Sequence, residues 1–298
     1  MAGITLFLLF YHVRPGETVT IEAKDASDGQ ITPESTVADI LNEDPERANP
    51  TTGPLYVEGA KPGDAISVTF IEYAPSGWGW TGNIPGFGLL TDQFPEAALT
   101  LWKYEKNGSG TTLFGENAHI PVRPFTGTLG NAQATPGTHS VIPPYNVGGN
   151  MDIKDMVTGS TVYLPVEVEG ALFSLGDTHA AQGDGEVCGT AIESPMNVTA
   201  KFDVVKQANL KFPKFEMPGN LHQRNLSHYK ATTGIGPDLL QAAKDAVTGM
   251  IDLLGKEQKL DPMDAYMLCS VCGDLRINEI VDLPNYVVSF YFPFSVFK

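Results

Sequence analysis

A glycine-rich stretch from Ser174 to Glu193 holds most of the side chains that could do chemistry; it reads SLGDTHAAQGDGEVCGTAIE. Glycine has no Cβ, so it accepts positive φ and lets the backbone come close to a ligand. Between Met156 and Ala200 there are six carboxylates and no Lys or Arg. This local excess of negative charge needs a metal, a proton or a distant cation, which is the first indication of a functional site.

Asp177 and His179 are separated by one residue, which places both side chains on one face of an extended segment. A carboxylate oxygen and an imidazole nitrogen can begin a divalent metal site that keeps an open position for water. Asp152, in GGNMD, is the preferred third ligand, and His139 is the alternative. An isolated Asp-x-His pair is more often a hydrogen-bonded turn, so the prediction depends on the carboxylates around it.

Glu186 and Glu193 are the candidates for general acid/base work in the same stretch. A carboxyl group that is crowded by others and partly desolvated keeps its proton to a higher pH, as proton transfer near neutrality requires. Either residue could instead be a solvated loop residue, and Glu186, between two small or apolar neighbours, is the favoured one.

Cys188 is the competing nucleophile, although the surrounding negative charge would raise its thiol pKa and disfavour the thiolate. A small buried residue is the favoured interpretation. Cys269 and Cys272 have no second pair for zinc and are predicted to be core residues. His222 and His228 lie in a polar connection and are not predicted to be ligands.

Several function classes are excluded by what the sequence lacks. No serine has glycines at both −2 and +2, there is no H-E-x-x-H, and the glycine-rich loops lack the Lys-Ser/Thr of a P-loop. The net charge of −16 disfavours nucleic acid and anionic membranes as partners. The apolar run near Met1 is too short to span a bilayer and does not resemble a signal peptide. Three cysteines fit a reducing cytoplasm.

Hydrophobic periodicity predicts many strands followed by a helical segment. The predicted strands are residues 17–24, 65–73, 99–106, 117–123, 161–169, 171–175, 197–205, 275–281 and 286–292. A helix is predicted from Pro237, as its first residue, to Leu254, and a second helix from Asp261 to Gly273. Residues 34–52 read as a short helix and a loop, and 76–90 and 125–150 as glycine-rich loops.

This order of elements predicts an α+β, predominantly β fold, with a β-sandwich or barrel-like core and a C-terminal helix pair and strands. We expect two parts: residues 1–205, a β-rich core that carries the catalytic motif, and residues 206–298, an α/β subdomain packed on it.

The stretch GDTHAAQGDGEVCGTAIE closely resembles the signature of the acetamidase/formamidase family, and DASDGQI, GGNMDIKDM and DLRINEIVDLPNYVVS also look like family segments. The resemblance covers nearly the whole chain, although relatives usually carry more sequence before the segment matching residues 12–18. It implies a C–N hydrolase acting on formamide, acetamide or a related small amide, with a divalent metal, zinc or alternatively calcium. The resemblance would place Asn150 and Asp152 close to the catalytic residues. It would place catalysis itself on Asp177, His179, Asp184, Glu186 and Glu193.

The leading hypothesis is therefore amide hydrolysis by metal-activated water. The metal ligands would be Asp152, Asp177 and His179. Glu186, Glu193 and Asp184 would be catalytic, and Asn150, Gln182 and Gly183 would bind substrate. Backbone N–H groups of residues 183–185 would receive the oxyanion. The alternatives are a Cys188 nucleophile, a non-catalytic module that binds a small ligand, and a structural acidic oligomer. The expected partners are a small amide and a second copy of the chain in a homodimer.

Overall fold

The computed structural model describes residues 11–114, 118–217, 228–262, 265, 269, 273–294 and 297. Most of the apolar run at the start lies outside these residues. So do His222, Cys272 and most of the second predicted C-terminal helix.

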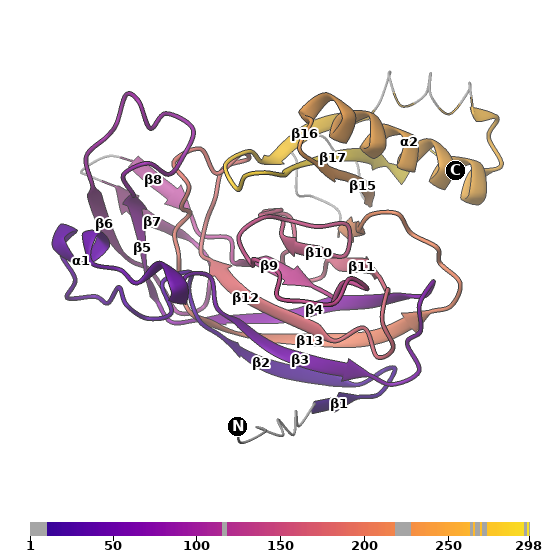
Figure 1. Ribbon diagram of the computed structural model, residues 1–298, viewed down its shortest axis with the longest axis horizontal. Helices are drawn as coiled ribbons and strands as arrows, with labels where there is room; N and C mark the ends of the chain where they lie inside the picture. Colours follow the sequence, from indigo (N-terminus) through magenta and orange to yellow (C-terminus); the bar gives the residue numbers. More distant parts are fainter. Residues whose placement is uncertain are drawn as a thin grey trace.

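In the described ranges, two large sheets form the centre of the molecule (Figure 1). The five-stranded sheet has the order β1 (Tyr11–Val13), β3 (Thr51–Val57), β12 (Phe173–His179), β9 (Phe125–Gly130) and β10 (Gly148–Asn150). The eight-stranded sheet has the order β16 (Asp274–Glu279), β17 (Tyr286–Pro293), β15 (Tyr229–Gly236), β14 (Lys214–Met217), β11 (Thr161–Pro165), β4 (Ala65–Pro75), β13 (Met196–Val205) and β2 (Thr18–Ala23).

Smaller elements cover the ends of these sheets. Two hairpins pair β5 (Trp78–Asn83) with β6 (Ala98–Lys103) and β7 (Thr111–Phe114) with β8 (Ala118–Pro121). The short helix α1 (Val37–Leu41) and the 3-10 turn η1 (Pro45–Arg47) lie near β5 and β6, whereas α2 (Leu239–Gln258) packs along β15 and β17. None of the described helices is both long and apolar enough to cross a membrane.

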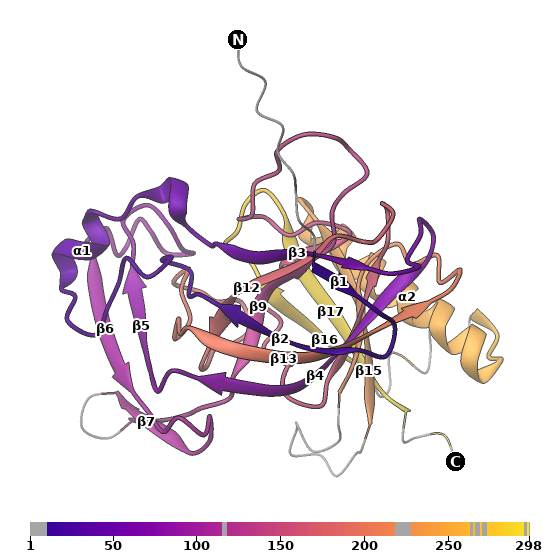
Figure 2. The same cartoon turned by 90° about the horizontal axis from the view of Figure 1, so that it is seen from below.

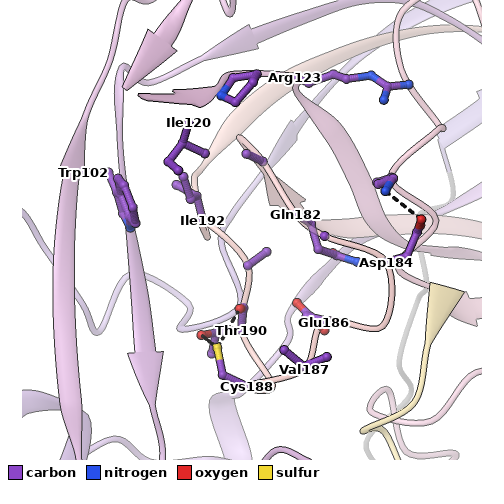
Figure 3. A pocket seen from close by; sticks show the side chains of 15 residues that line it. Trp102, Ile120, Arg123, Gln182, Asp184, Glu186, Val187, Cys188, Thr190 and Ile192 are labelled. Atoms are coloured by element: carbon purple, nitrogen blue, oxygen red, sulfur yellow. Dashed lines mark hydrogen bonds and ion pairs between the residues drawn. The ribbon is translucent and has the colours of Figure 1, made fainter. Parts of the chain in front are cut away.

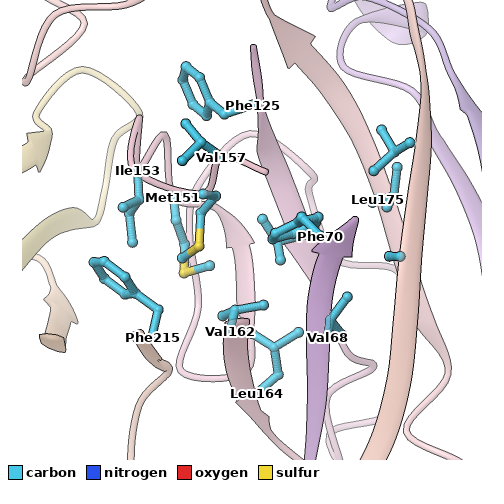
Figure 4. Close-up of a cluster of buried hydrophobic side chains, with 14 of the residues drawn as sticks. Val68, Phe70, Phe125, Met151, Ile153, Val157, Val162, Leu164, Leu175 and Phe215 are labelled. Carbon is cyan, nitrogen blue, oxygen red and sulfur yellow. The ribbon is translucent and has the colours of Figure 1, made fainter. Parts of the chain in front are cut away.

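The two sheets face each other across one large apolar core. Figure 2 shows β3, β12 and β9 in one layer and β2, β13 and β4 in the other. Val68 and Phe70 of β4 point into this core with Val162 and Leu164 of β11 (Figure 4), and all four are fully buried. The alternation of apolar and polar residues predicted for β4 is thus the pattern that fills the space between the sheets.

The predicted α+β, predominantly β class is confirmed. The helix predicted from Pro237 begins two residues later, because the side chain of Asp238 caps it by accepting from the N–H of Gln241. The eight-stranded sheet contains strands from both sides of residue 205. The division of the chain at that residue stays a prediction.

The prediction was wrong for two segments described as glycine-rich loops, because the strands there are rich in glycine. Residues 76–90 contain β5, and residues 125–150 contain β9 and β10. The short helix expected within residues 34–52 is α1, and β3 begins at the last two residues of that range. A Cβ on Gly130 would lie 2.6 Å from the backbone nitrogen of Gly149, and a Cβ on Gly79 would lie 2.6 Å from the backbone carbonyl oxygen of Glu193. Glycine in these strands marks close approach of two backbones and not a turn.

Asp155 joins the two halves of the chain through a buried polar network. Its carboxylate accepts from Arg123 Nη2 at 2.6 Å and from the Tyr291 hydroxyl at 2.9 Å, and it is fully buried. We expect Asp155→Ala to lower the free energy of unfolding by about 1–3 kcal/mol, because the partly buried Arg123 guanidinium and the buried Tyr291 hydroxyl lose this acceptor. Asp245→Ala, which breaks the exposed pair with Lys211, should cost under about 1 kcal/mol in the same urea titration.

Candidate active site

The strand β12 delivers Asp177 and His179 to the same point at its C-terminal end. His179 Nε2 lies 3.0 Å from Asp177 Oδ1, and both side chains are buried. Thr178, between them, points the other way and donates to the Ser194 carbonyl. The edge of the His179 ring packs on Phe125, with ring centroids 5.0 Å apart, so the plane of the imidazole is held.

The neighbouring strand β9 leaves room for these side chains by carrying a glycine. A Cβ on Gly127 would overlap Asp152 Oδ1 and would lie 2.8 Å from His179 Cε1 and 2.9 Å from Asp177 Oδ2. Three functional groups thus converge on a space that only glycine leaves open. The next residue, Thr128, has its hydroxyl 3.2 Å from Asp177 Oδ2.

The long segment after β9 returns to the same edge and brings Asp152 into the cluster. Asn150 of β10 pairs with Thr128, and the Asp152 N–H donates to the Gly127 carbonyl. Asp152 Oδ1 lies 3.8 Å from His179 Nδ1. Both carboxylate oxygens of Asp152 are buried without a hydrogen-bond partner.

The loop after β12 closes the cluster from another side. Glu193 lies opposite His179 in an isolated bridge, and its Oε2 is 3.1 Å from His179 Nε2. Its Oε1 accepts from the Ala191 N–H at 2.7 Å. Glu186 is buried at a turn in which its N–H donates to the Gly183 carbonyl.

Two further carboxylates from the C-terminal part belong to the cluster, although the sequence analysis did not single them out. Asp282 Oδ2 accepts from Asn150 Nδ2 at 2.6 Å, and burial, then the charge of Asp152, raises the pKa of Asp282 well above its usual value. Glu279 is fully buried, and its Oε1 accepts from the Asp282 N–H. The only available signal was their place in the family-like segment DLRINEIVDLPNYVVS.

Burial and mutual repulsion change the ionisation of the whole cluster. Burial, then the charge of Asp177, raises the pKa of Asp152 well above its usual value. Burial, then the charge of Asp152, raises the pKa of Glu186 well above its usual value. Burial raises the pKa of Glu193 to about 7. Burial acts to lower the pKa of His179, but the carboxylates of Glu193 and Asp177 raise it well above its usual value. The site therefore has more carboxyl groups than one imidazole can balance if all of them ionise, so some of them keep a proton unless a cation is bound.

Gln182 fixes which nitrogen of His179 carries a proton. Its Nε2 donates to the Asp152 carbonyl at 2.9 Å, so its Oε1 is the atom that faces His179 Nδ1 at 2.8 Å. Nδ1 is therefore the donor, and in the neutral imidazole Nε2 presents a lone pair to Asp177 and Glu193. Three electron-rich atoms that converge in this way need a cation or a second proton between them.

The backbone at this site is also unusual. Asp152, Asp177 and Glu186 all have left-handed conformations, with φ of 48°, 51° and 44°. Such conformations are costly for residues other than glycine and occur mainly where function requires a particular side-chain direction. Three of them in one cluster support a functional site.

Two cavities reach the cluster, and Glu186 and Thr190 line both. A cavity of about 260 Å³ is lined by Asn150, Asp177, Glu193 and Asp282 as well, and we call it the inner cavity. A second cavity, of about 460 Å³, lies beyond Glu186 and is lined by Gln182, Cys188, Trp102 and Ile192, among others (Figure 3). We call it the outer cavity.

The structure brings most of the predicted site residues together, but not all of them. Asp184 lines the outer cavity and pairs with Lys154 at 2.7 Å, away from His179. Gly183 and Gln182 also line the outer cavity, whereas Asn150 lines the inner one. His139, the alternative ligand, is exposed and bonds to the Thr135 carbonyl.

Two groups in the described part of the chain have the geometry to hold a metal ion, and His179 belongs to both. One contains Asp177 and Glu193, and the other contains Asp152 and Glu186. In each group the ligand atoms lie within 4.8 Å of one another. The site thus offers oxygen and nitrogen donors that suit a divalent cation.

A buried acid–histidine cluster beside a small cavity can support metal-assisted or acid–base chemistry, and comparison with known proteins makes the class specific. A model of the acetamidase/formamidase family matches residues 8–136 and 131–298. The chain belongs to this family, and the expected membership of a class of amide-hydrolysing enzymes is confirmed.

Named relatives agree with this assignment. An acetamidase from Mycolicibacterium smegmatis is 33% identical, over 65% of this chain and 63% of that protein, so the match spans less than two thirds of that relative. A formamidase from Methylophilus methylotrophus is 28% identical, over 96% of this chain and 86% of that protein. The crystal structure of an acetamidase from Bacillus halodurans superposes with a TM-score of 0.86 at 32% identity, covering 96% and 92% of the two chains.

Proposed function

We propose that this protein hydrolyses short aliphatic amides of the formamide and acetamide type to carboxylate and ammonia. The observation that carries the proposal is the convergence of Asp152, Asp177, Glu186 and Glu193 on His179 beside the inner cavity. The relatives named acetamidase and formamidase support the choice of substrate class.

A divalent cation fits the cluster, and we propose zinc, with calcium as the alternative. Both oxygens of Asp152, Glu193 Oε2 and Glu279 Oε2 are buried without a hydrogen-bond partner, and Gly127 leaves space between Asp152, Asp177 and His179. These three residues would hold the ion, with Glu193 beside them. Such an ion would polarise the amide carbonyl and lower the pKa of a bound water.

Glu186 is the residue that we assign to proton transfer. It is the cluster carboxylate that lines both cavities, so it can reach a bound amide from the inner cavity and exchange protons with the outer one. Its raised pKa lets it hold a proton for the departing ammonia near neutral pH. Glu193 is held by the Ala191 N–H and faces His179, so a role beside the cation suits it better.

The substrate amide would be oriented by the Asn150–Asp282 pair at the inner cavity. Asn150 Nδ2 donates to one oxygen of Asp282, which leaves the other oxygen to accept an amide N–H.

The oxyanion role expected for the backbone N–H groups of residues 183–185 needs revision, because the Gly185 N–H already donates to the Asn278 carbonyl. Asp184, paired with Lys154, would act at the outer cavity, beside Gln182 and Gly183.

A direct test is ammonia release from formamide and acetamide by the purified protein. Turnover of either amide supports the proposal. If no short amide releases ammonia, the proposed function is wrong, and the alternative of a non-catalytic module that binds small ligands would take its place.

The second candidate mechanism uses Cys188 as the nucleophile. It predicts that the Cys188→Ala variant is inactive, whereas hydrolysis by metal-activated water predicts that this variant stays active. Cys188 lines the outer cavity, and its sulfur contacts Thr190, 3.3 Å from the carbonyl oxygen (Figure 3). Because nothing in that contact would stabilise a thiolate, we expect Cys188→Ala to keep at least about half of the amide turnover. A loss of more than about 100-fold would favour the acyl-enzyme route.

The homodimer and the cytoplasmic location also stay predictions. Sedimentation of the purified protein and fractionation of cells that express it would test them.

A further inference from the structure

The inner cavity is larger than formamide or acetamide requires. It measures about 260 Å³. At about 30 Å³ for each water-sized group, the four heavy atoms of acetamide would fill roughly 120 Å³. More than half of the cavity therefore remains for a further part of the substrate.

A half-buried carboxyl group lies in a wall of this cavity that is remote in sequence from the acid–histidine cluster. Glu43 belongs to the segment between α1 and η1, and it lines the inner cavity beside the buried side chains of Ile40 and Trp80. Its Oε1 is buried and has no hydrogen-bond partner. A buried acceptor without a donor is costly and needs an explanation.

The cavity offers Glu43 no protein cation. None of the described residues that line it is Lys, Arg or His, whereas several are carboxylates. The nearby Asp25 is already engaged, because it accepts from the Ser27 N–H and from Trp80 Nε1. A molecule in the cavity that carries an N–H group could therefore supply the donor that Glu43 Oε1 lacks.

We propose that Glu43 is a specificity-determining residue that binds an N–H donor group at the far end of the substrate. This inference rests on the proposed amidase function and narrows it. The preferred substrates are short amides that carry a second, amino group, and not simple alkyl amides.

The ionisation of Glu43 is consistent with this proposal. Burial, then the charge of Asp25, raises the pKa of Glu43 to about 7. An ammonium group in contact would offset both effects, because it favours the charged carboxylate.

Two amides of equal size test the proposal. β-Alaninamide and butyramide each have six heavy atoms and differ only in a terminal amine in place of a methyl group. We expect the wild-type protein to prefer β-alaninamide in kcat/KM by about tenfold or more, as a hydrogen bond to a charged group allows. Glu43→Leu should remove the preference, and Glu43→Gln should reduce it. Acetamide turnover should change little in both variants.

The matched control is Glu46→Gln, because Glu46 is exposed on the neighbouring turn and does not line the cavity. Glu46→Gln should keep the wild-type ratio of kcat/KM for β-alaninamide to kcat/KM for butyramide. If Glu43→Leu also keeps that ratio, or if the wild-type protein shows no preference while it hydrolyses acetamide, the Glu43 proposal is wrong and the amidase function stands. If no amide is hydrolysed, the amidase function fails. Calorimetric binding of the two amides to wild-type and Glu43→Leu protein then still decides the role of Glu43.

Discussion

Replacing Gly127 by Ala is expected to reduce amide turnover by about 100-fold or more while the protein stays folded. The added Cβ would overlap Asp152 Oδ1 and would lie 2.8 Å from His179 Cε1. At least one of these groups must move, and a misplacement of about 1 Å in a catalytic site can cost about 100-fold. Steady-state ammonia release and thermal unfolding, measured on the same samples, check the two parts of this expectation.

Gly236→Ala is the matched control for this variant. A Cβ on Gly236 meets no atom within 4 Å, and its φ is not in the left-handed region. It should therefore leave turnover unchanged. Wild-type activity in Gly127→Ala would contradict the account, because it would mean that the space between the three side chains is not used.

Replacing His179 by Gln is expected to abolish both metal binding and turnover. His179 is the one residue common to the two groups in the described chain that could hold a metal, with its Nε2 3.0 Å from Asp177 Oδ1 and 3.1 Å from Glu193 Oε2. We expect turnover to fall by more than about 100-fold, the upper range for losing only a hydrogen-bond partner of a metal ligand. Elemental analysis of the purified variant gives the metal content.

His139→Gln serves as the control, because His139 is exposed and bonds to the Thr135 carbonyl. Metal content and turnover should both match the wild-type protein. Full turnover in His179→Gln would overturn the assignment of the site, and loss of metal in His139→Gln would restore His139 as the alternative ligand.

The centre of the site could be predicted from local spacing alone. Asp177 and His179 are two residues apart on β12, and the period of two of a strand predicts that they share a face. The left-handed conformation of Asp177 is a local departure that this spacing does not predict. Asp152 was predicted from its position at the end of a glycine-rich segment. The structure brings it to His179 because that segment is a strand that pairs with β9.

The remaining members of the cluster depend on long-range pairing, which has no local signal. Asp282 reaches Asn150 across more than one hundred residues of sequence, through the turn after β16. The cation that balances Asp184 was missed for a similar reason. Lys154 lies two residues before the stretch from Met156 to Ala200 that has no Lys or Arg, and the fold brings it to Asp184.

The glycines had two roles that the sequence could not separate. In the Ser174–Glu193 stretch they allow turns, as at Gly185 and Gly189, which have positive φ. In β9 and β10 they allow strands to approach closely, as at Gly127 and Gly130. Composition predicts a loop in both cases, and only the pairing of the strands distinguishes them.

Ammonia release from acetamide and formamide, measured on chelated protein and again after a divalent ion is restored, tests the central claim most directly. We expect chelation to remove turnover and zinc, or alternatively calcium, to restore it, because the buried carboxylates around His179 need a cation between them. Full turnover of either amide by protein shown to be free of metal would contradict the account.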